Sequence, residues 1–130
     1  MQSREQQTAA AVYEKVDAYA RANKKDSPER DKYGGTAQKL PVLVRTAGLV
    51  QALAFVQSRK GDPYKQFLGD LAAVLGAQNA DALLRSSRGA NLEEYIYLTE
   101  RTMLALKWFK RFAQSVLEVE ATVEARGVEP

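Results

Sequence analysis

Apolar side chains recur at intervals of three and four residues along several stretches of the chain, which is the spacing of one face of an α-helix. In the first stretch they are Ala9, Val12, Tyr13, Val16, Tyr19 and Ala20. This pattern predicts a helix over about 3–24. A break follows at 24–29, where Ser27 can accept hydrogen bonds from free backbone N–H groups and Pro28 suits a first helical position. A second helix is therefore expected to begin there.

The second predicted helix contains residues that disturb helical backbone. Gly34 and Gly35 weaken a helix because glycine loses more conformational freedom on folding than other residues. Pro41 lacks a backbone N–H group, and its ring clashes with the preceding turn. We therefore expect a kink near Pro41.

Glycine, proline and asparagine mark the next helix boundaries. The apolar run 49–56 predicts a third helix, and Gly61-Asp62-Pro63 ends it and begins a fourth over 63–75. Asn79 can cap a short fifth helix that ends at Gly89.

The longest predicted helix lies toward the C-terminal end. Asn91 followed by Glu94 has the form of a capping box, in which each side chain satisfies a backbone N–H group of the other. No helix-breaking residue occurs before Gly127, so the pattern predicts a helix of about 35 residues and roughly 50 Å. Its apolar positions cover about half of the circumference, which indicates packing against more than one partner helix.

The composition favours an all-α fold and excludes several kinds of chemistry. The 130 residues contain neither cysteine nor histidine, so disulfides, Cys or His zinc sites, thiolate nucleophiles and imidazole bases are excluded. No apolar run approaches the roughly 18 residues of a membrane span, and the first residues lack an apolar signal core. We expect a compact, all-α, single-domain bundle of five or six helices over 1–130, in the cytoplasm and without membrane contact.

Positive charge is concentrated in the first half of the chain, although the net charge is only +3. Nine Lys or Arg and three acidic residues lie within 21–60, whereas 112–130 holds one basic and four acidic residues. The basic residues at predicted helix ends and irregular positions are Lys24, Lys25, Arg30, Lys32, Lys39, Arg45, Arg59 and Lys60. Backbone N–H groups at such points are also available to phosphate oxygens.

A second basic cluster lies on the last predicted helix and comprises Lys107, Lys110 and Arg111. Their spacing of three and four residues places them on one side of that helix. Two interpretations stay open for both clusters, a solvated helix face or contacts with the phosphate groups of a nucleic acid. Phosphate contacts predict an affinity that falls with salt by a slope of about −0.7 per contact on a single strand. A solvated face predicts no such dependence.

Aromatic side chains offer possible stacking surfaces for bases, but most of them fall on apolar helix faces and are expected in the core. Tyr33 is the best exception, because Lys32 and two glycines give it small and basic neighbours. Its surroundings suit close approach to a nucleic-acid strand.

No catalytic constellation is recognisable in the sequence. Glu93 and Glu94 fit a helix cap, and Gly34-Gly35 lacks the Gly-Lys-Ser or Gly-Lys-Thr ending of a phosphate-binding loop. Ser86 and Ser87 have no histidine base available. We therefore expect no catalytic residues, no metal site, no cofactor and no small-molecule substrate.

An ordered set of short motifs extends over about 33–113. In the first half they are Tyr33-Gly34-Gly35, Ala37-Gln38-Lys39-Leu40-Pro41, Gly48-Leu49 and Gln51-Ala52-Leu53-Ala54-Phe55. In the second half they are Tyr97-Leu98-Thr99-Glu100 and Leu106-Lys107-Trp108-Phe109-Lys110-Arg111-Phe112-Ala113. This set resembles the small-subunit family of the type III-B CRISPR effector, the Cmr complex. Ala47 departs from the asparagine that is more often expected before Gly48 in that family.

The resemblance implies a compact all-helical protein without catalysis of its own. In such complexes several copies of the small subunit line up beside the backbone subunits that hold the guide RNA. Their basic faces help to form the channel for the target strand. The implied partners are therefore other subunits, neighbouring copies of the same chain, and guide and target RNA within the assembly. The eleven basic residues of the two clusters are the expected RNA-binding side chains.

Two other hypotheses follow from the residues alone. A stand-alone helical nucleic-acid-binding or adaptor protein would show the same charge asymmetry. A helix-turn-helix, however, needs an exposed recognition helix, and the segment after Gly48 is too apolar for one. A small enzyme acting through Lys or Tyr would instead show a deep pocket enclosing a Lys or a carboxylate with a strongly displaced pKa.

Overall fold

The computed structural model describes residues 1–120, and this part of the chain contains six helices and no strand. The helices are α1 (Arg4–Ala22), α2 (Pro28–Ala47), α3 (Leu49–Ser58), α4 (Asp62–Val74), α5 (Ala80–Gly89) and α6 (Leu92–Ser115). The predicted all-α class with a long last helix is confirmed. Within the described residues no helix has the length and apolarity needed to cross a bilayer.

Side-chain caps explain where most of these helices begin. The hydroxyl of Ser27 accepts from the backbone N–H of Arg30, and the side chain of Asn79 accepts from Ala82. Asn91 and Glu94 form the predicted capping box at the start of α6. Each cap satisfies a backbone donor that the first helical turn leaves without a partner, so the predicted starting points are confirmed.

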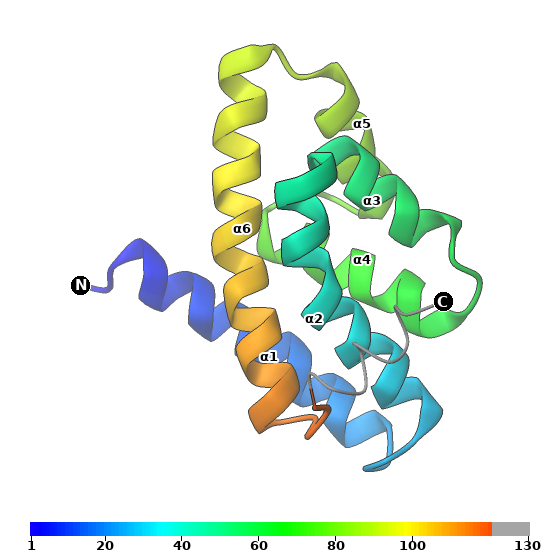
Figure 1. Ribbon diagram of the computed structural model, residues 1–130. Coiled ribbons are helices and arrows are strands. Elements are labelled where there is room, and N and C mark those ends of the chain that lie inside the picture. The colour runs from blue at the N-terminus through cyan, green and yellow to red at the C-terminus, as the bar shows by residue number, and fades with distance from the viewer. Residues whose placement is uncertain (121–130) are drawn as a thin grey trace.

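α2 is the central helix of the bundle, in contact with α3, α4 and α6. Figure 1 shows α6 beside α2, with α1 crossing the end of this pair where α6 finishes. The core includes a chain of aromatic rings, in which the Phe67 centroid lies 5.2 Å from that of Tyr33 and 5.0 Å from that of Phe109. α2 is continuous through Pro41.

The predicted length of the last helix is wrong, because α6 ends at Ser115 rather than near Gly127, which lies outside the described residues. Glu118 adopts a left-handed backbone with φ 60°, although it is not glycine, and the chain turns back toward α2. The backbone N–H of Leu117 donates to Phe112 O, and that of Val119 donates to Ala113 O. These bonds satisfy the last helical carbonyls, and the turn buries Leu117 and Val119 in the core.

Gly34 is required by this returning segment. A Cβ atom added at Gly34 would lie 2.7 Å from Cγ2 of Val119 and 2.8 Å from its Cβ. The glycine therefore lets the returning segment approach the α2 backbone closely. We refer to residues 116–120 as the C-terminal hook.

Candidate nucleic-acid interface

A groove between α2 and α6 joins the two basic clusters that are separate in the sequence. Arg45 lies on α2, while Lys107, Lys110 and Arg111 lie on α6. Pro41, Met103 and Gln114 complete the lining of a space of about 330 Å³. We call this feature the α2–α6 groove. The helix pairing, rather than proximity in the sequence, brings its four cations together.

Most of the positive charge in the α2–α6 groove is not neutralised. Lys107 pairs with Glu5 of α1, and this contact lowers the pKa of the Glu5 carboxyl. Arg45, Lys110 and Arg111 form no ion pair with any residue among 1–120. Since phosphate binding draws on free cations, these three side chains are the ones available for it.

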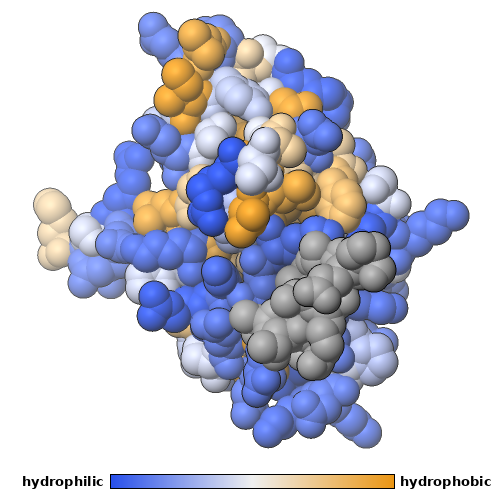
Figure 2. All heavy atoms as spheres, in the orientation of Figure 1, coloured by the Kyte–Doolittle hydropathy of each residue, from blue (hydrophilic) through white to orange (hydrophobic). Residues whose placement is uncertain are grey.

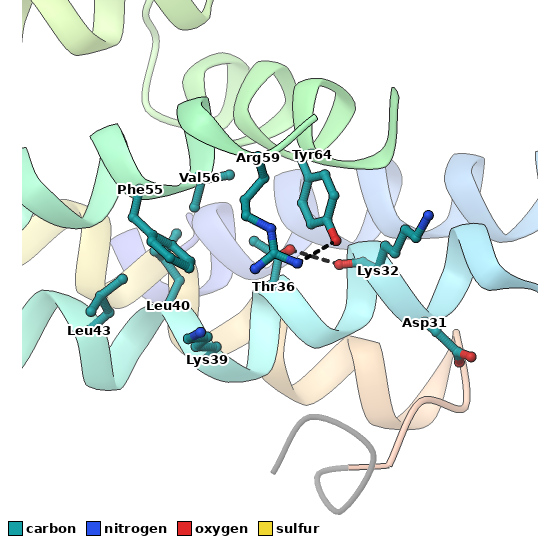
Figure 3. Close-up of a pocket in the computed structure, with 10 residues that line it drawn as sticks. All are labelled: Asp31, Lys32, Thr36, Lys39, Leu40, Leu43, Phe55, Val56, Arg59 and Tyr64. Carbon is teal, nitrogen blue, oxygen red and sulfur yellow. Dashed lines mark hydrogen bonds between the residues drawn. The ribbon is translucent and has the colours of Figure 1, made fainter. Parts of the chain in front are cut away.

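A second concavity lies where α2, α3 and the start of α4 meet, and we call it the α2–α4 hollow. Figure 3 shows the residues around its space of about 180 Å³, which are Asp31, Lys32, Thr36, Lys39, Leu40, Leu43, Phe55, Val56, Arg59 and Tyr64. The lining combines apolar side chains with three cations and the carboxylate of Asp31. Figure 2 shows a mainly hydrophilic face, with hydrophobic groups gathered near the start of α6 and around α2 and α3.

Aromatic rings hold two of the cations of the α2–α4 hollow in place. Lys39 Nζ lies 4.5 Å from the Phe55 ring centroid. The central guanidinium carbon of Arg59 lies 4.9 Å from the Tyr64 centroid and 5.6 Å from that of Phe55. Arg59 Nη2 also donates to the Tyr64 hydroxyl at 3.0 Å, as the dashed line in Figure 3 marks. A guanidinium stacked on a ring keeps other N–H donors for an anion.

Three other predicted site residues line neither the α2–α6 groove nor the α2–α4 hollow. Lys24 and Lys60 are exposed at helix ends. Lys25 is exposed as well, and its Nζ pairs with Glu118 Oε1 of the C-terminal hook at 3.2 Å.

Arg30 has a structural position, so we withdraw it from the predicted RNA-binding set. Only 9% of the side chain is exposed. Its guanidinium donates to the carbonyl oxygens of Asn23, Ala20 and Leu117, at 2.8, 2.9 and 3.1 Å. These bonds satisfy carbonyls at the end of α1 and in the C-terminal hook. Each of the three guanidinium nitrogens therefore takes part in holding the fold together.

Tyr33 also differs from its prediction, because its side chain is fully buried rather than open to a strand. Its hydroxyl donates to Asp70 Oδ2 at 2.6 Å, and Gln66 donates to Asp70 Oδ1 at 2.9 Å. Burial raises the pKa of Tyr33 above its usual range and also raises the pKa of the Asp70 carboxyl. Of its small neighbours, Gly34 serves the close approach of the C-terminal hook rather than that of a nucleic-acid strand.

Asp70, the carboxyl with a raised pKa, lies in the core and lines neither the groove nor the hollow. No cluster of three acidic residues that could hold a metal ion occurs among residues 1–120.

The sequence prediction overlooked Phe55 and the pair Arg4 and Arg101. Phe55 precedes Arg59 by four residues, a spacing that places neighbours on one helix face and could have indicated the cation–ring contact. Arg4 and Arg101 both approach Tyr97. Their separation along the chain hides this cluster from any local charge count.

The fold and the two concavities define a small all-helical protein whose cations line a groove and a hollow. The family described as "CRISPR-associated protein (Cas_Cmr5)" matches residues 4–116. The chain is 45% identical over 118 residues to the "CRISPR system Cmr subunit Cmr5" of Thermus thermophilus, which covers 91% of this chain and 99% of that protein. A crystal structure of a CRISPR-associated Cmr5 family protein from the same organism superposes with a TM-score of 0.80. That match has 44% identity and covers 92% of this chain and 100% of the other.

The chain therefore belongs to the Cmr5 family. The family that the sequence motifs resembled is confirmed.

Proposed function

We propose that this chain is the small subunit of a type III-B RNA-guided effector, the Cmr complex, and that it lines the channel for the target RNA. Its partners would be the other subunits, neighbouring copies of itself, and the guide and target RNA held by the assembly. Its relative from Thermus thermophilus is described as a subunit of the Cmr system, which supports this assignment.

The observation that carries the proposed RNA contact is the α2–α6 groove. Arg45, Lys110 and Arg111 come from two helices and face one space without acidic partners among the described residues. Such a groove offers charge to a phosphate backbone without reading bases, because lysine and arginine contacts with phosphate carry no sequence information. Base pairing with a guide would supply the specificity.

Lys32, Lys39 and Arg59 of the α2–α4 hollow extend the proposed contact surface. Lys24, Lys25 and Lys60 remain in the proposed set as peripheral contacts, and Lys107 remains as a contact within the groove. Lys25 and Lys107 would each exchange a carboxylate partner for phosphate. Arg30 is excluded, because its donors are bonded to carbonyl oxygens.

The proposed role is binding and assembly without a reaction of its own. A single copy presents few phosphate contacts, so the isolated chain should bind single-stranded RNA weakly and lose it at moderate salt. Copies arranged in series would add their contacts on one strand and raise the overall affinity.

Charge reversal in the assembled complex tests this function. A Cmr complex carrying Lys39→Glu, Arg45→Glu and Lys110→Glu in this subunit should capture target RNA at least tenfold more weakly than the unchanged complex. A matched variant with Arg85→Glu, Arg88→Glu and Lys65→Glu, outside the groove and the hollow, controls for the change of net charge. Equal target binding by the two variants would refute the residue assignment.

Incorporation is scored separately by co-purification with the larger subunits and a guide RNA of defined length. If the unchanged chain never enters such an assembly, the proposed function itself fails. If both variants assemble and only the first loses target RNA, the proposal stands.

A further inference from the structure

A concavity between the first turns of α1 and the first half of α6 contains the pair Arg4 and Arg101, and it lies outside the α2–α6 groove and the α2–α4 hollow. Arg4 Nη1 donates to the Tyr97 hydroxyl at 3.1 Å. The central guanidinium carbon of Arg4 lies 5.7 Å from the Tyr97 ring centroid, and that of Arg101 lies 5.8 Å from it. Gln7 and Thr8 add polar side chains to a space of about 300 Å³. We call this the Arg4–Arg101 site.

The charge of the Arg4–Arg101 site is not neutralised within residues 1–120. Neither arginine forms an ion pair there. Glu5, the acidic residue adjoining Arg4 in the chain, is held by Lys107 farther along α6. Two guanidinium groups therefore lie close to one ring, with no acidic partner of either among these residues.

The geometry of these groups suits an oxyanion. A guanidinium placed over an aromatic face keeps its in-plane N–H donors, and its planar fork matches two oxygens of a phosphate. Tyr97 contacts both guanidinium groups beside one space, and Gln7 and Thr8 of α1 also line that space. Lysines would supply charge at this position but neither the fork nor the stacked orientation.

Continuity with the α2–α6 groove indicates where the phosphate comes from. Arg101 and Arg111 are ten residues apart on α6, about 15 Å along the helix axis and within a quarter turn of each other. Lys107 lies between them in the sequence, and its side chain is exposed. A strand lying in the groove can therefore pass over α6 toward Arg4 without meeting the apolar core.

We propose that the Arg4–Arg101 site binds a phosphodiester group of the same single-stranded RNA that occupies the α2–α6 groove. This inference rests on the proposed function and extends the strand path over the outside of α6 to α1. Tyr97 acts as a positioning residue for the two guanidinium groups.

Low-salt titration of the full chain with single-stranded RNA tests the proposal. Oligoribonucleotides of about 4 and about 16 nucleotides represent the two ends of the usual site sizes. Arg4→Ala with Arg101→Ala should weaken binding of the longer RNA several-fold and reduce the salt slope by about 1.4, which is two contacts of about 0.7 each. Arg85→Ala with Arg88→Ala on α5 removes equal charge elsewhere and should leave both unchanged. Equal behaviour of the two double variants would overturn the proposal.

Three further comparisons show why RNA binding depends on Arg4 and Arg101. Arg4→Lys with Arg101→Lys preserves charge, so weakened binding by this variant supports a fork geometry and unchanged binding contradicts it. The shorter RNA cannot reach both the groove and the site, and its affinity should depend less on Arg4 and Arg101. If inorganic phosphate shifts the Nε–H resonances of both arginines as strongly as the longer RNA does at equal phosphate concentration, the site binds free phosphate and the strand path is wrong.

Lys110→Ala with Arg111→Ala, measured in parallel, distinguishes this inference from the proposed function. If only the Lys110 and Arg111 variant loses RNA binding, while the Arg4 and Arg101 variant keeps it, the groove assignment stands and the Arg4–Arg101 site is rejected. Loss in both variants supports a continuous path, provided that far-ultraviolet circular dichroism shows unchanged helicity.

Discussion

Two arginines of α2 that look alike in the sequence have opposite surroundings in the fold. Arg30, in the first turn, is buried and donates to carbonyl oxygens of α1, the segment after α1 and the C-terminal hook. Arg45, in the last turn, is exposed at the α2–α6 groove and has no ion-pair partner among residues 1–120.

The difference follows from what each side chain meets. Near Arg30, the end of α1 and the turn after α6 leave carbonyl groups without helical partners, and a guanidinium satisfies several of them at once. Near Arg45 the groove is lined by other cations with Pro41, Met103 and Gln114 and by no acidic residue, so the charge of Arg45 remains available. Local acceptors, rather than charge density in the sequence, decide which cations stabilise the fold and which can bind a ligand.

Replacing each arginine in turn gives the largest contrast. Arg30→Met should lower the free energy of unfolding by about 3 kcal/mol, because it leaves carbonyl groups without their charged donor. Arg45→Met should change it by less than about 0.5 kcal/mol, as expected of an exposed residue. Urea denaturation of both variants measures the two values. Similar losses in the two variants would contradict the division of roles.

Gly34 provides a smaller test of the same internal region. Gly34→Ala should lower the free energy of unfolding by about 2 kcal/mol, because the new Cβ overlaps Val119 of the C-terminal hook. In a Val119→Gly background the same change should stabilise the protein by about 0.5–1 kcal/mol, since alanine favours a helix interior over glycine. Urea denaturation of the unchanged protein, the two single variants and the double variant gives a double-mutant cycle. If Gly34→Ala also destabilises the Val119→Gly protein, the overlap with Val119 is not the cause of the loss.

The buried tyrosines predict a loss of stability at alkaline pH. Burial raises the pKa of Tyr19 to about 12 and that of Tyr33 beyond its usual range. In the unfolded chain both ionise near a pH of about 10, so above this pH the unfolded state releases protons that the folded state keeps. The free energy of unfolding should therefore fall, by about 1 kcal/mol for each of the two tyrosines between roughly pH 9 and pH 11.

Tyr33→Phe should make this dependence on pH shallower, whereas Tyr13→Phe, at an exposed position, serves as the control. Urea midpoints at the two pH values provide the measurement. A slope unaffected by Tyr33→Phe would show that Tyr33 does not hold its proton in the folded state as described.

The smallest expected effect concerns single cations of the α2–α6 groove. Arg45→Ala should leave the free energy of unfolding unchanged within about 0.5 kcal/mol while reducing the salt slope of RNA binding by about 0.7. Titrations at several salt concentrations give the slope. A weaker affinity with an unchanged slope would mean that Arg45 does not contact phosphate.

Much of the fold was predictable because helix starts depend on local chemistry. Ser27, Asn79 and Asn91 cap their helices by accepting from residues three positions later, and such pairs are visible in the sequence. The end of α6 was not predictable in this way. Its turn places Glu118 in a left-handed conformation without glycine, and the cause is the burial of Leu117 and Val119 against α2.

The basic groups of the candidate interface were predictable one by one, but their arrangement was not. Lys110 and Arg111 share a helix, whereas Arg45 joins them only through the pairing of α2 with α6. Arg4 and Arg101 were overlooked for the same reason, since Tyr97 brings them together across the bundle. Burial of Arg30 and Tyr33 likewise depends on distant segments.

Photo-crosslinking from the lining of the α2–α6 groove asks whether target RNA occupies this groove. Benzoylphenylalanine at Gln114, which lines the groove, is introduced into the subunit and the assembled Cmr complex is irradiated with labelled target RNA. The account predicts a crosslink between this position and the target strand, and none from the same group at Arg88 on α5. Crosslinks from Gln114 to protein alone, with target RNA bound to the complex, would contradict it.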